Sequence, residues 1–443
     1  MRHGLLRHAL DRWVDPADAF VTLFAGQTDV AWLDCGPQAT SGRSYLAAAA
    51  RVLTTGSSTR PVLDFLRDDL AANRVEQDGN DGFGPGWFGW LGYETRHETM
   101  DAAPSSDADS AFLFADRVIE FDHEARTVTL VVLGESWTGE VGQWRRAIVA
   151  ALEHPIASPV SPSPSAANPP VALWRDSDRE YLAMIGDCKA AIARGDAYLL
   201  CLTTSVSVET QQDPVATYLA LRRSSPSHHG GLVRIGGTAL LSSSPERFLS
   251  VTPDGVIESR PIKGTRPRGS TERDDAALAR ELGASEKERA ENLMIVDLMR
   301  NDIGRVSRIG SIEVPSLLEV ESYAQVHQLV STVRGTLAAG LDGMDAVVAC
   351  FPAGSMTGTP KSSAVRILDA LERHPRGIYS GAFGYFGLDG RIDLAMVIRS
   401  IVMTSTGATI GTGGGITALS DPAEELAEVK LKAAVLLGVL GVS

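Results

Sequence analysis

The chain has little cysteine and no long hydrophobic run. The first shortage argues against a disulfide-rich protein, and the second argues against a membrane-spanning one. The four cysteines are scattered among 443 residues without the spacing of a metal site or a disulfide framework, which favours buried thiols in a reducing compartment. They are Cys35, Cys188, Cys201 and Cys350. The longest apolar stretch, near 433–442, is interrupted by two glycines and is roughly half as long as a bilayer span. Residues 1–11 lack the apolar core of a signal peptide, so we expect no membrane segment and a cytoplasmic location.

Basic residues are too few for a nucleic-acid binder. Lysine and arginine number 41 against 55 aspartates and glutamates, which gives a formal net charge of −14, and no basic stripe offsets this acidity. An anionic substrate can bind such a chain only where clustered Arg and Lys, or a bound cation, reverse the local field. With 44% hydrophobic and 22% charged residues, the composition is otherwise that of a globular protein, of one large domain or two closely packed ones.

One stretch divides the chain. Ile156–Pro170 is rich in Pro, Ser and Ala and has no apolar periodicity, so we interpret it as a linker between a shorter β-rich region at 1–155 and a longer region at 171–443. In the first region, β-branched runs predict strands at Phe20–Phe24, Arg117–Phe121 and Thr127–Leu133. The alternation of Gly with aromatics at Gly82–Gly92 is typical of a tight strand corner.

The second region mixes strands and helices without regular alternation. Periodicity predicts helices at Tyr181–Arg194, at Glu286–Asp302 and from Pro422 onward. Strands are expected at Ala197–Val208, Gly231–Ile235, Leu240–Ser242, Gly381–Phe386, Ile392–Thr404 and Ala408–Thr412. Because the strands group as hairpins, the pattern indicates an α+β architecture and not a doubly wound sheet.

Two of these helices begin with matched carboxylates. Ser285 can cap one helix with Glu288 at the capping-box position, and Glu291 follows one turn later. The last helix repeats the pattern after Asp421 and Pro422, with Glu425 and Glu428 three residues apart. Any one of these glutamates can simply complement a helix dipole. Two pairs from distant segments can instead converge on one Mg²⁺ ion, which takes a few carboxylate oxygens and keeps other positions open.

Candidate anion-binding groups precede the last helix. The glycine run Gly411–Gly415, which includes Gly413 and Gly414, follows a β-branched strand, and its backbone N–H groups can approach a carboxylate, although a flexible turn is the alternative. Arg399 and Tyr379 together offer a guanidinium and a phenol for a second carboxylate. For Arg399 alone, a surface ion pair is the ordinary interpretation.

A lysine stands among arginines at Glu258–Gly269. Such crowding usually marks a solvated loop, but like charges also lower the pKa of a lysine, so that Lys263 could be a partly neutral nucleophile. Glu246 and His327 are isolated candidates for proton transfer, and either can equally be structural.

Seven segments together resemble the chorismate-utilising enzymes, a family that includes anthranilate, aminodeoxychorismate, isochorismate and salicylate synthases. The resemblance spans nearly the whole chain. Its segments are GWFGWLGYE (Gly86–Glu94), SPERFL (Ser244–Leu249), PIKGTRPRG (Pro261–Gly269), ENLMIVDLMRNDIGRV (Glu291–Val306), PAGSMTGTPK (Pro352–Lys361), GIYSGAFGYFG (Gly377–Gly387) and the run from GTGGGI to DPAEELAEVKLKA (Gly411–Ala433). The resemblance implies an α+β fold, in which large antiparallel sheets pack as a two-layer sandwich with helices outside.

The resemblance also implies roles for individual residues. Glu291 and Glu428 would hold Mg²⁺ with help from Glu288 and Glu425. The ring carboxylate of chorismate would lie between the metal and the backbone of Gly413–Gly415, near Lys432. Further implied positions are Tyr379 and Arg399 for the enolpyruvyl carboxylate, Glu246 as the general acid for the C4 hydroxyl, His327 and Thr265 near the ring, and Ser355 at a substrate-binding position where the family usually has threonine.

Two positions divide the family. Isochorismate and salicylate synthases carry a water-activating lysine where this chain has Leu199, so the resemblance disfavours attack by water; the aminating branches usually have glutamine there. Lys263, in PIKGT, is similar to the lysine with which aminodeoxychorismate synthases attack ring C2, whereas anthranilate synthases typically read PIAGT. The implied reaction is amination of chorismate at C4 through a lysine adduct. No glutamine-hydrolysing module is evident, so the implied partner is a separate glutamine amidotransferase subunit, with which the chain would form a heterodimer.

Two other functions stay open. An anthranilate synthase component I would differ only in where ammonia enters, at C2 with loss of pyruvate. A binding subunit without turnover, which senses chorismate or an aromatic amino acid, belongs to another class and would leave chorismate unconsumed.

Overall fold

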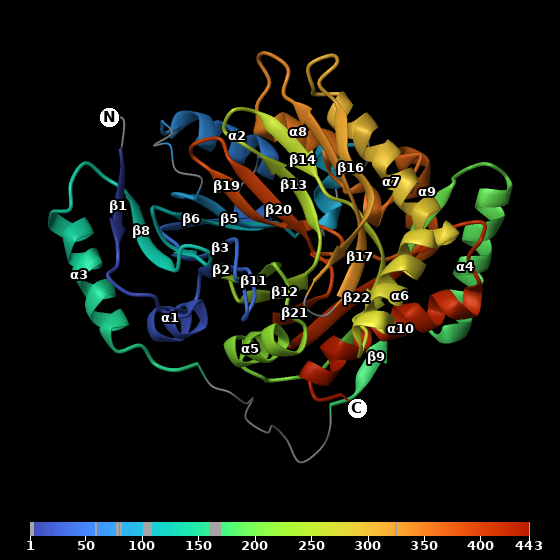
Figure 1. Ribbon diagram of the computed structural model, residues 1–443, viewed down its shortest axis with the longest axis horizontal. Coiled ribbons are helices and arrows are strands. Elements are labelled where there is room, and N and C mark those ends of the chain that lie inside the picture. The colour runs from blue at the N-terminus through green and yellow to red at the C-terminus, as the bar shows by residue number, and fades with distance from the viewer. Residues whose placement is uncertain are drawn as a thin grey trace.

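Two antiparallel sheets form the centre of the molecule, and the computed structural model shows them packed face to face (Figure 1). Trp90 of one sheet and Val233 of the other belong to the same buried cluster, which fills the space between the sheets. The structure describes residues 4–57, 60–76, 79, 82–100, 109–158, 170–323 and 326–442. Most of the expected linker, at 159–169, lies outside these residues.

The first sheet runs from the N-terminal strand to the strands beside the glycine run. Its order is β1 (Leu5–Ala9), β8 (Thr127–Leu133), β7 (Arg117–Asp122), β3 (Arg43–Ala48), β2 (Val30–Asp34), β11 (His229–Ile235), β12 (Thr238–Ser244), β21 (Ser400–Thr404), β22 (Gly407–Ile416), β10 (Leu199–Val208) and β18 (Gly358–Thr359), with β9 (Ala172–Trp174) also pairing with β10.

In the second sheet, as in the first, neighbouring strands are often far apart in the chain. It runs through β15 (Ile262–Pro267), β17 (Val326–Thr336), β14 (Val256–Ser259), β13 (Arg247–Val251), β20 (Ile392–Met396), β19 (Ala382–Gly387), β5 (Gly86–Leu91), β6 (Ala111–Ala115) and β4 (Arg51–Thr54), with β16 (Glu313–Ser322) also pairing with β17. In both sheets a strand from before residue 156 pairs with one from after residue 170: Leu33 faces Gly231, and Trp90 faces Phe383. The two regions of the chain therefore share both sheets.

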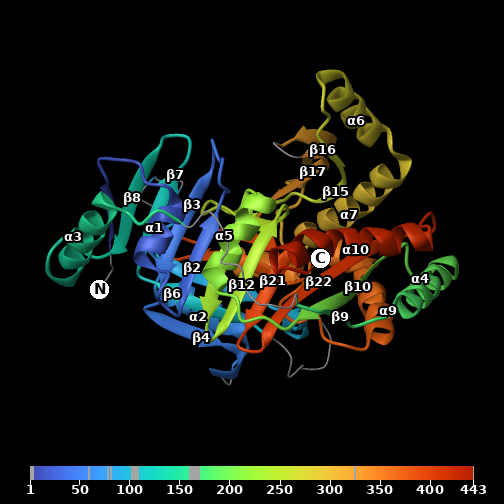
Figure 2. The ribbon, with the colours of Figure 1, turned by 90° about the horizontal axis from the view of Figure 1, so that it is seen from below.

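Helices cover the outer face of each sheet. Apolar side chains of α1 (Pro16–Leu23), α3 (Gly139–Glu153), α5 (Pro214–Ser224) and α10 (Pro422–Val439) pack on the first sheet, and those of α2 (Val62–Ala72), α7 (Glu286–Gly304) and α8 (Gly343–Cys350) pack on the second. The helices α4 (Asp178–Ala193) and α9 (Lys361–Glu372) pack against β10. Figure 2 shows α6 (Glu272–Ala284) projecting with β15, β16 and β17 from one end of the molecule. The expected two-layer α+β sandwich is confirmed.

Short 3₁₀ turns occupy η1 (Thr55–Ser57), η2 (Tyr93–Glu98) and η3 (Gly354–Met356). The three helices predicted in the second region correspond to α4, α7 and α10. The helices α7 and α10 begin at the predicted residues, Glu286 and Pro422, whereas both ends of α4 and the C-terminal end of α7 are shifted. Gly82–Gly92 contains β5, which is buried along its whole length, rather than a corner. A Cβ on Gly89 would lie 2.0 Å from the carbonyl oxygen of Ala111, so the close approach of β6 requires glycine there.

Two strand predictions are wrong. Phe20–Phe24 lies mostly in α1, because Asp15 accepts a hydrogen bond from the N–H of Ala17 and Pro16 takes the first helical position, so local start signals outweigh the β-forming run. Ile392–Thr404 is not one strand but two, β20 and β21, which belong to different sheets. The backbone breaks between them, where Arg399 adopts a left-handed φ of 50°. Among the described helices, none is both long and apolar enough to cross a bilayer.

Candidate functional site

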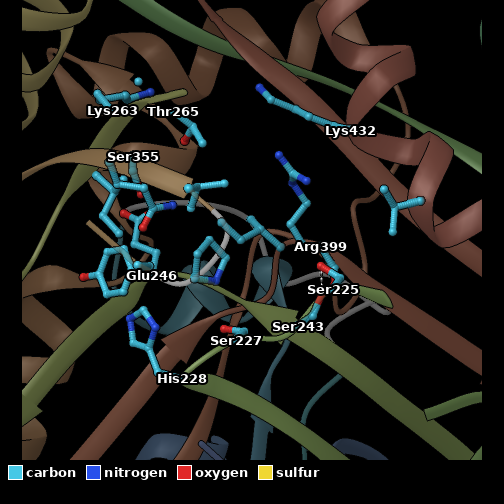
Figure 3. A pocket seen from close by; sticks show the side chains of 18 of the residues that line it. Ser225, Ser227, His228, Ser243, Glu246, Lys263, Thr265, Ser355, Arg399 and Lys432 are labelled. Carbon is cyan, nitrogen blue, oxygen red and sulfur yellow. Dashed lines mark hydrogen bonds between the residues drawn. The ribbon is translucent and has the colours of Figure 1, made fainter. Parts of the chain in front are cut away.

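A cavity of roughly 830 Å³ opens between α7 and β15 on one side and α10 and β22 on the other. Figure 3 shows Lys263 and Lys432 toward one side, Ser227 and His228 toward the opposite side, and Glu246 and Arg399 between them. The structure brings together all but one of the candidate site residues. The lining includes Glu246, Lys263, Thr265, Glu288, Glu291, Ser355, Tyr379, Arg399, Gly413, Gly414, Gly415, Glu425, Glu428 and Lys432.

His327 is the exception. It lies on β17 and is 1% exposed, and its neighbours Val326 and Gln328 line the cavity while it does not. Its two ring nitrogens are within hydrogen-bond distance of Ser322 (2.8 Å) and Asp275 (2.9 Å). Because neighbouring residues of a strand point to opposite faces, His327 faces α6 instead of the cavity, so its side chain lies outside the cavity lining and its role near the ring stays a prediction.

The predicted caps position the carboxylates. The Ser285 hydroxyl accepts a hydrogen bond from the N–H of Glu288 at the start of α7, and Asp421 accepts two at the start of α10. These local bonds fix where each helix begins, and the helical repeat then puts the glutamates one turn apart on a face toward the cavity. Glu291 and Glu425 are buried there.

Each of the four carboxylates has a basic partner. The contacts are Glu291 with Lys263 (3.9 Å), Glu288 with Arg266 (3.6 Å), Glu425 with Lys287 (2.9 Å) and Glu428 with Lys432 (2.8 Å). Within the described ranges, no group of three or more His, Cys, Asp and Glu side chains is arranged to hold a metal ion. The donor set of hard carboxylate oxygens does fit Mg²⁺ chemically, but in this structure protein cations neutralise it.

Lys263 extends into the cavity with a side chain that is 15% exposed. Burial lowers the pKa of Lys263, but the negative charge of Glu291 and of the other acidic groups near the amine raises the pKa more. The net shift of the pKa is therefore upward. The expectation that neighbouring arginines would lower this pKa is therefore wrong. Those arginines are each engaged elsewhere: Arg260 with Glu321, Arg266 with Glu281 and Arg268 with Asp275.

Glu246 is an acid suited to neutral pH. Its side chain is buried at the end of β12, and burial raises its pKa to about 7, against the lowering effects of Lys263 and of a hydrogen bond with Ser355. A carboxyl group of this pKa is partly protonated near neutrality and can donate a proton to a leaving oxygen.

Arg399 and Tyr379 both line the cavity. Burial lowers the pKa of Arg399, and its guanidinium makes no hydrogen bond or ion pair with any described residue. A partly buried cation of this kind, without a partner among the described residues, favours a bound anion. The ring of Tyr379 lies against β22, where a Cβ on Gly411 would be 2.0 Å from it, so this contact requires glycine.

The glycine run is a strand and not the expected turn. Gly413, Gly414 and Gly415 pair with β10, but β21 pairs with β22 only as far as Ile410. The following part of β22 therefore pairs with a described strand on one side, and its other edge lies next to the cavity. Lys432 donates to the carbonyl of Gly413 at 2.9 Å.

Two features were not predicted from the sequence. Lys287 lines the cavity, and its position between Ser285 and Glu288 is the sequence signal that could have indicated this. The cavity also extends to 35–41 and 225–228, which come from the N-terminal region and from the loop before β11. Nothing in the local pattern of either segment links it to the glutamates.

Comparisons with known proteins agree on one family. A family model described as chorismate binding enzyme matches residues 28–438. A protein named aminodeoxychorismate synthase from Streptomyces pristinaespiralis is 42% identical over 96% of this chain and 64% of its own length. An anthranilate synthase component 1 from Streptomyces coelicolor is 35% identical over 97% of this chain and 87% of its own length.

The solved structures agree with the fold. Anthranilate synthase component I from Streptococcus pneumoniae superposes with a TM-score of 0.78 at 27% identity, covering 96% of this chain and 97% of that one. The chain spans somewhat less than two thirds of two of the aminodeoxychorismate synthases that it matches, 64% of the one from Streptomyces pristinaespiralis and 63% of one from Streptomyces griseus.

Proposed function

The chain belongs to the chorismate-binding enzyme family, and from this premise we propose that it aminates chorismate at C4 to give 4-amino-4-deoxychorismate. The relatives named aminodeoxychorismate synthase support this choice within the family. The observation that carries the proposal is the amine of Lys263, which lines the cavity 3.9 Å from Glu291 and within the electrostatic influence of Glu246.

The first step forms a covalent adduct. Lys263 loses a proton, and its Nζ bonds to ring C2 while both ring double bonds shift, C1=C2 to C1=C6 and C5=C6 to C4=C5, and the C4–O bond breaks. Glu246 supplies a proton to the departing hydroxyl, which leaves as water. Arg399 and Tyr379 hold the enolpyruvyl carboxylate, and Lys432 and the free edge of β22 hold the ring carboxylate, so that C2 faces the amine.

The second step releases the product. Ammonia bonds to C4, both ring double bonds return to their original positions, and the C2–Nζ bond breaks. A proton lost by the incoming nitrogen balances the one that Lys263 regains. The ammonia comes from a separate glutamine amidotransferase subunit in the cytoplasm. In support, burial raises the pKa of all four cysteines, to about 12 for Cys35, Cys188 and Cys350, so none is suited to be the thiolate that hydrolyses glutamine.

Magnesium is part of the proposal. Glu291 and Glu428 would hold Mg²⁺, with Glu288 and Glu425 assisting directly or through water. The ion would supply positive charge for the ring carboxylate in a protein whose net charge is −14.

A product assay tests the function. The chain is incubated with chorismate, Mg²⁺ and an ammonium salt, with and without a lyase that removes pyruvate from 4-amino-4-deoxychorismate. We expect chorismate to be consumed and no anthranilate fluorescence to develop. Unconsumed chorismate would instead indicate a binding subunit without turnover.

A second candidate is anthranilate synthase component I. It is favoured by the anthranilate synthase relative, of which the chain spans 87% at 35% identity. Anthranilate fluorescence that appears without the lyase would establish this alternative and reject amination at C4.

A further inference from the structure

Lys287 connects the two acidic helices across the cavity. It lies in the first turn of α7, and its Nζ donates to Oε1 of Glu425 on α10 at 2.9 Å. The two residues are 138 positions apart in the chain. Among the described contacts of the four glutamates, this ion pair is the one that joins α7 to α10, because Lys432 shares α10 with Glu428, and Lys263 and Arg266 come from β15.

The Lys287–Glu425 pair neutralises a carboxylate that water cannot reach. The Glu425 side chain is 3% exposed, whereas that of Lys287 is 34% exposed. A buried carboxylate without a partner is costly, so some cation must stand beside Glu425 whenever no other ligand does. Glu425 belongs to the carboxylates proposed to hold or assist the metal, and one carboxylate oxygen cannot fully serve both an ammonium and a divalent ion.

The lysines that pair with the glutamates differ in how easily their ammonium groups can move away from the carboxylates into solvent. Lys263 is 15% exposed and comes from the strand that forms the cavity wall. Lys287 lies near the surface, on a long flexible stem that can carry its ammonium into water. It can release its carboxylate without leaving a charge unsolvated.

We propose that Lys287 is a displaceable internal counter-cation, which occupies Glu425 when no metal is bound and must leave it when Mg²⁺ binds. The proposal rests on the metal site of the proposed function. It assigns Lys287 a role in setting how tightly the protein holds its metal: the ammonium keeps α7 and α10 together in the metal-free protein and weakens metal binding by competition.

Metal titration of the substrate-free protein tests this role. Mn²⁺ is the probe, because it takes the same oxygen ligands as Mg²⁺ and its binding is followed by electron paramagnetic resonance and calorimetry. In Lys287→Met the competing ammonium is absent, and we expect Mn²⁺ to bind about tenfold more tightly than in the wild type. Lys430→Met is the matched control, because Lys430 lies on α10 and pairs with Asp178 away from the cavity. It should bind Mn²⁺ as the wild type does.

A second measurement separates competition from simple cross-linking. Without its lysine, Glu425 is stabilised only by metal, so Mn²⁺ should raise the melting temperature of Lys287→Met by more than it raises that of the wild type. Lys287→Arg keeps the charge and should retain wild-type or weaker affinity. Unchanged or weaker Mn²⁺ binding by Lys287→Met, with a fold shown intact by circular dichroism, overturns the proposal while the proposed function stands. Absence of Mn²⁺ binding by the wild type overturns the metal site itself and this inference with it.

Discussion

Lys263 combines two properties that bear on its proposed role as the nucleophile. It extends into the cavity, and Glu291 raises its pKa, so the amine must lose a proton before it can attack carbon. We expect Lys263→Ala to form no covalent adduct and to lose at least about 100-fold in ammonia-dependent turnover. The measurements are intact-protein mass spectrometry with chorismate and the rate of chorismate consumption. Wild-type protein that turns over without any adduct would remove the nucleophile from the mechanism.

Glu246 makes folding stability depend on pH. Its folded pKa of about 7 lies above the ordinary value of 4.5, so the folded protein binds this proton more tightly than the unfolded chain does. The stability that the protonated carboxyl contributes is fully present below pH 4.5 and is lost as pH rises toward 7. Glutamine does not titrate, so Glu246→Gln does not show this loss. The difference in unfolding free energy between Glu246→Gln and the wild type should therefore be about 2 to 3 kcal/mol more favourable to the variant at pH 8 than at pH 4.

Urea unfolding at the two pH values checks this, and Glu319→Gln, on an exposed part of β16, is the control. The same Glu246→Gln protein cannot protonate the C4 hydroxyl, so its turnover should fall by about 100-fold or more. An equal stability difference at both pH values would show that folding does not raise the pKa of Glu246.

At the scale of single elements, β22 depends on its glycines for the shape of the site. Gly411→Ala would put a Cβ 2.0 Å from the ring of Tyr379, so the ring must move. We expect KM for chorismate to rise by about tenfold or more, since Tyr379 is proposed to hold a carboxylate of the substrate. Gly438→Ala is the matched control, because no atom lies within 4 Å of its added Cβ and alanine favours the helix. Unchanged KM in Gly411→Ala would place the substrate away from Tyr379.

The two capped helices act together in the proposed metal site. Glu291→Gln removes one carboxylate charge from α7, and Glu428→Gln removes one from α10. We expect each change to weaken Mn²⁺ binding by at least about tenfold, and excess EDTA to stop turnover until Mg²⁺ is restored. Calorimetry and the chorismate assay are the measurements. Full activity in EDTA would contradict a metal-dependent reaction.

At the scale of the whole molecule, we expect the chain to use free ammonia as its nitrogen source. All four cysteines are buried or partly buried with raised pKa values, so the chain holds no thiol suited to cleave glutamine. We expect the purified chain to consume chorismate with an ammonium salt and not with glutamine, and to accept glutamine once a glutamine amidotransferase is added. Turnover with glutamine by the chain alone would show that it needs no partner.

Much of the fold could be predicted locally. The start of α7 at Ser285, the start of α10 at Asp421 and several strands follow from caps and from apolar periodicity, which involve residues within a few positions of one another. Such signals can also mislead, as at Phe20–Phe24, where the helix start at Asp15 and Pro16 prevails over a β-forming run. The α+β class does not depend on any one of these elements.

The sequence by itself determined the residue types of the site, the caps that orient its glutamates and, through the family resemblance, the chemistry to be expected of them. Only the tertiary structure decided which charges meet: Lys287 with Glu425, Lys263 with Glu291, and His327 with Asp275 away from the cavity. It also decided that the pKa of Lys263 is raised. The reason is distance, because a cap is a hydrogen bond between near neighbours in the chain, whereas the energy of a charge depends on groups that folding brings from anywhere in the chain.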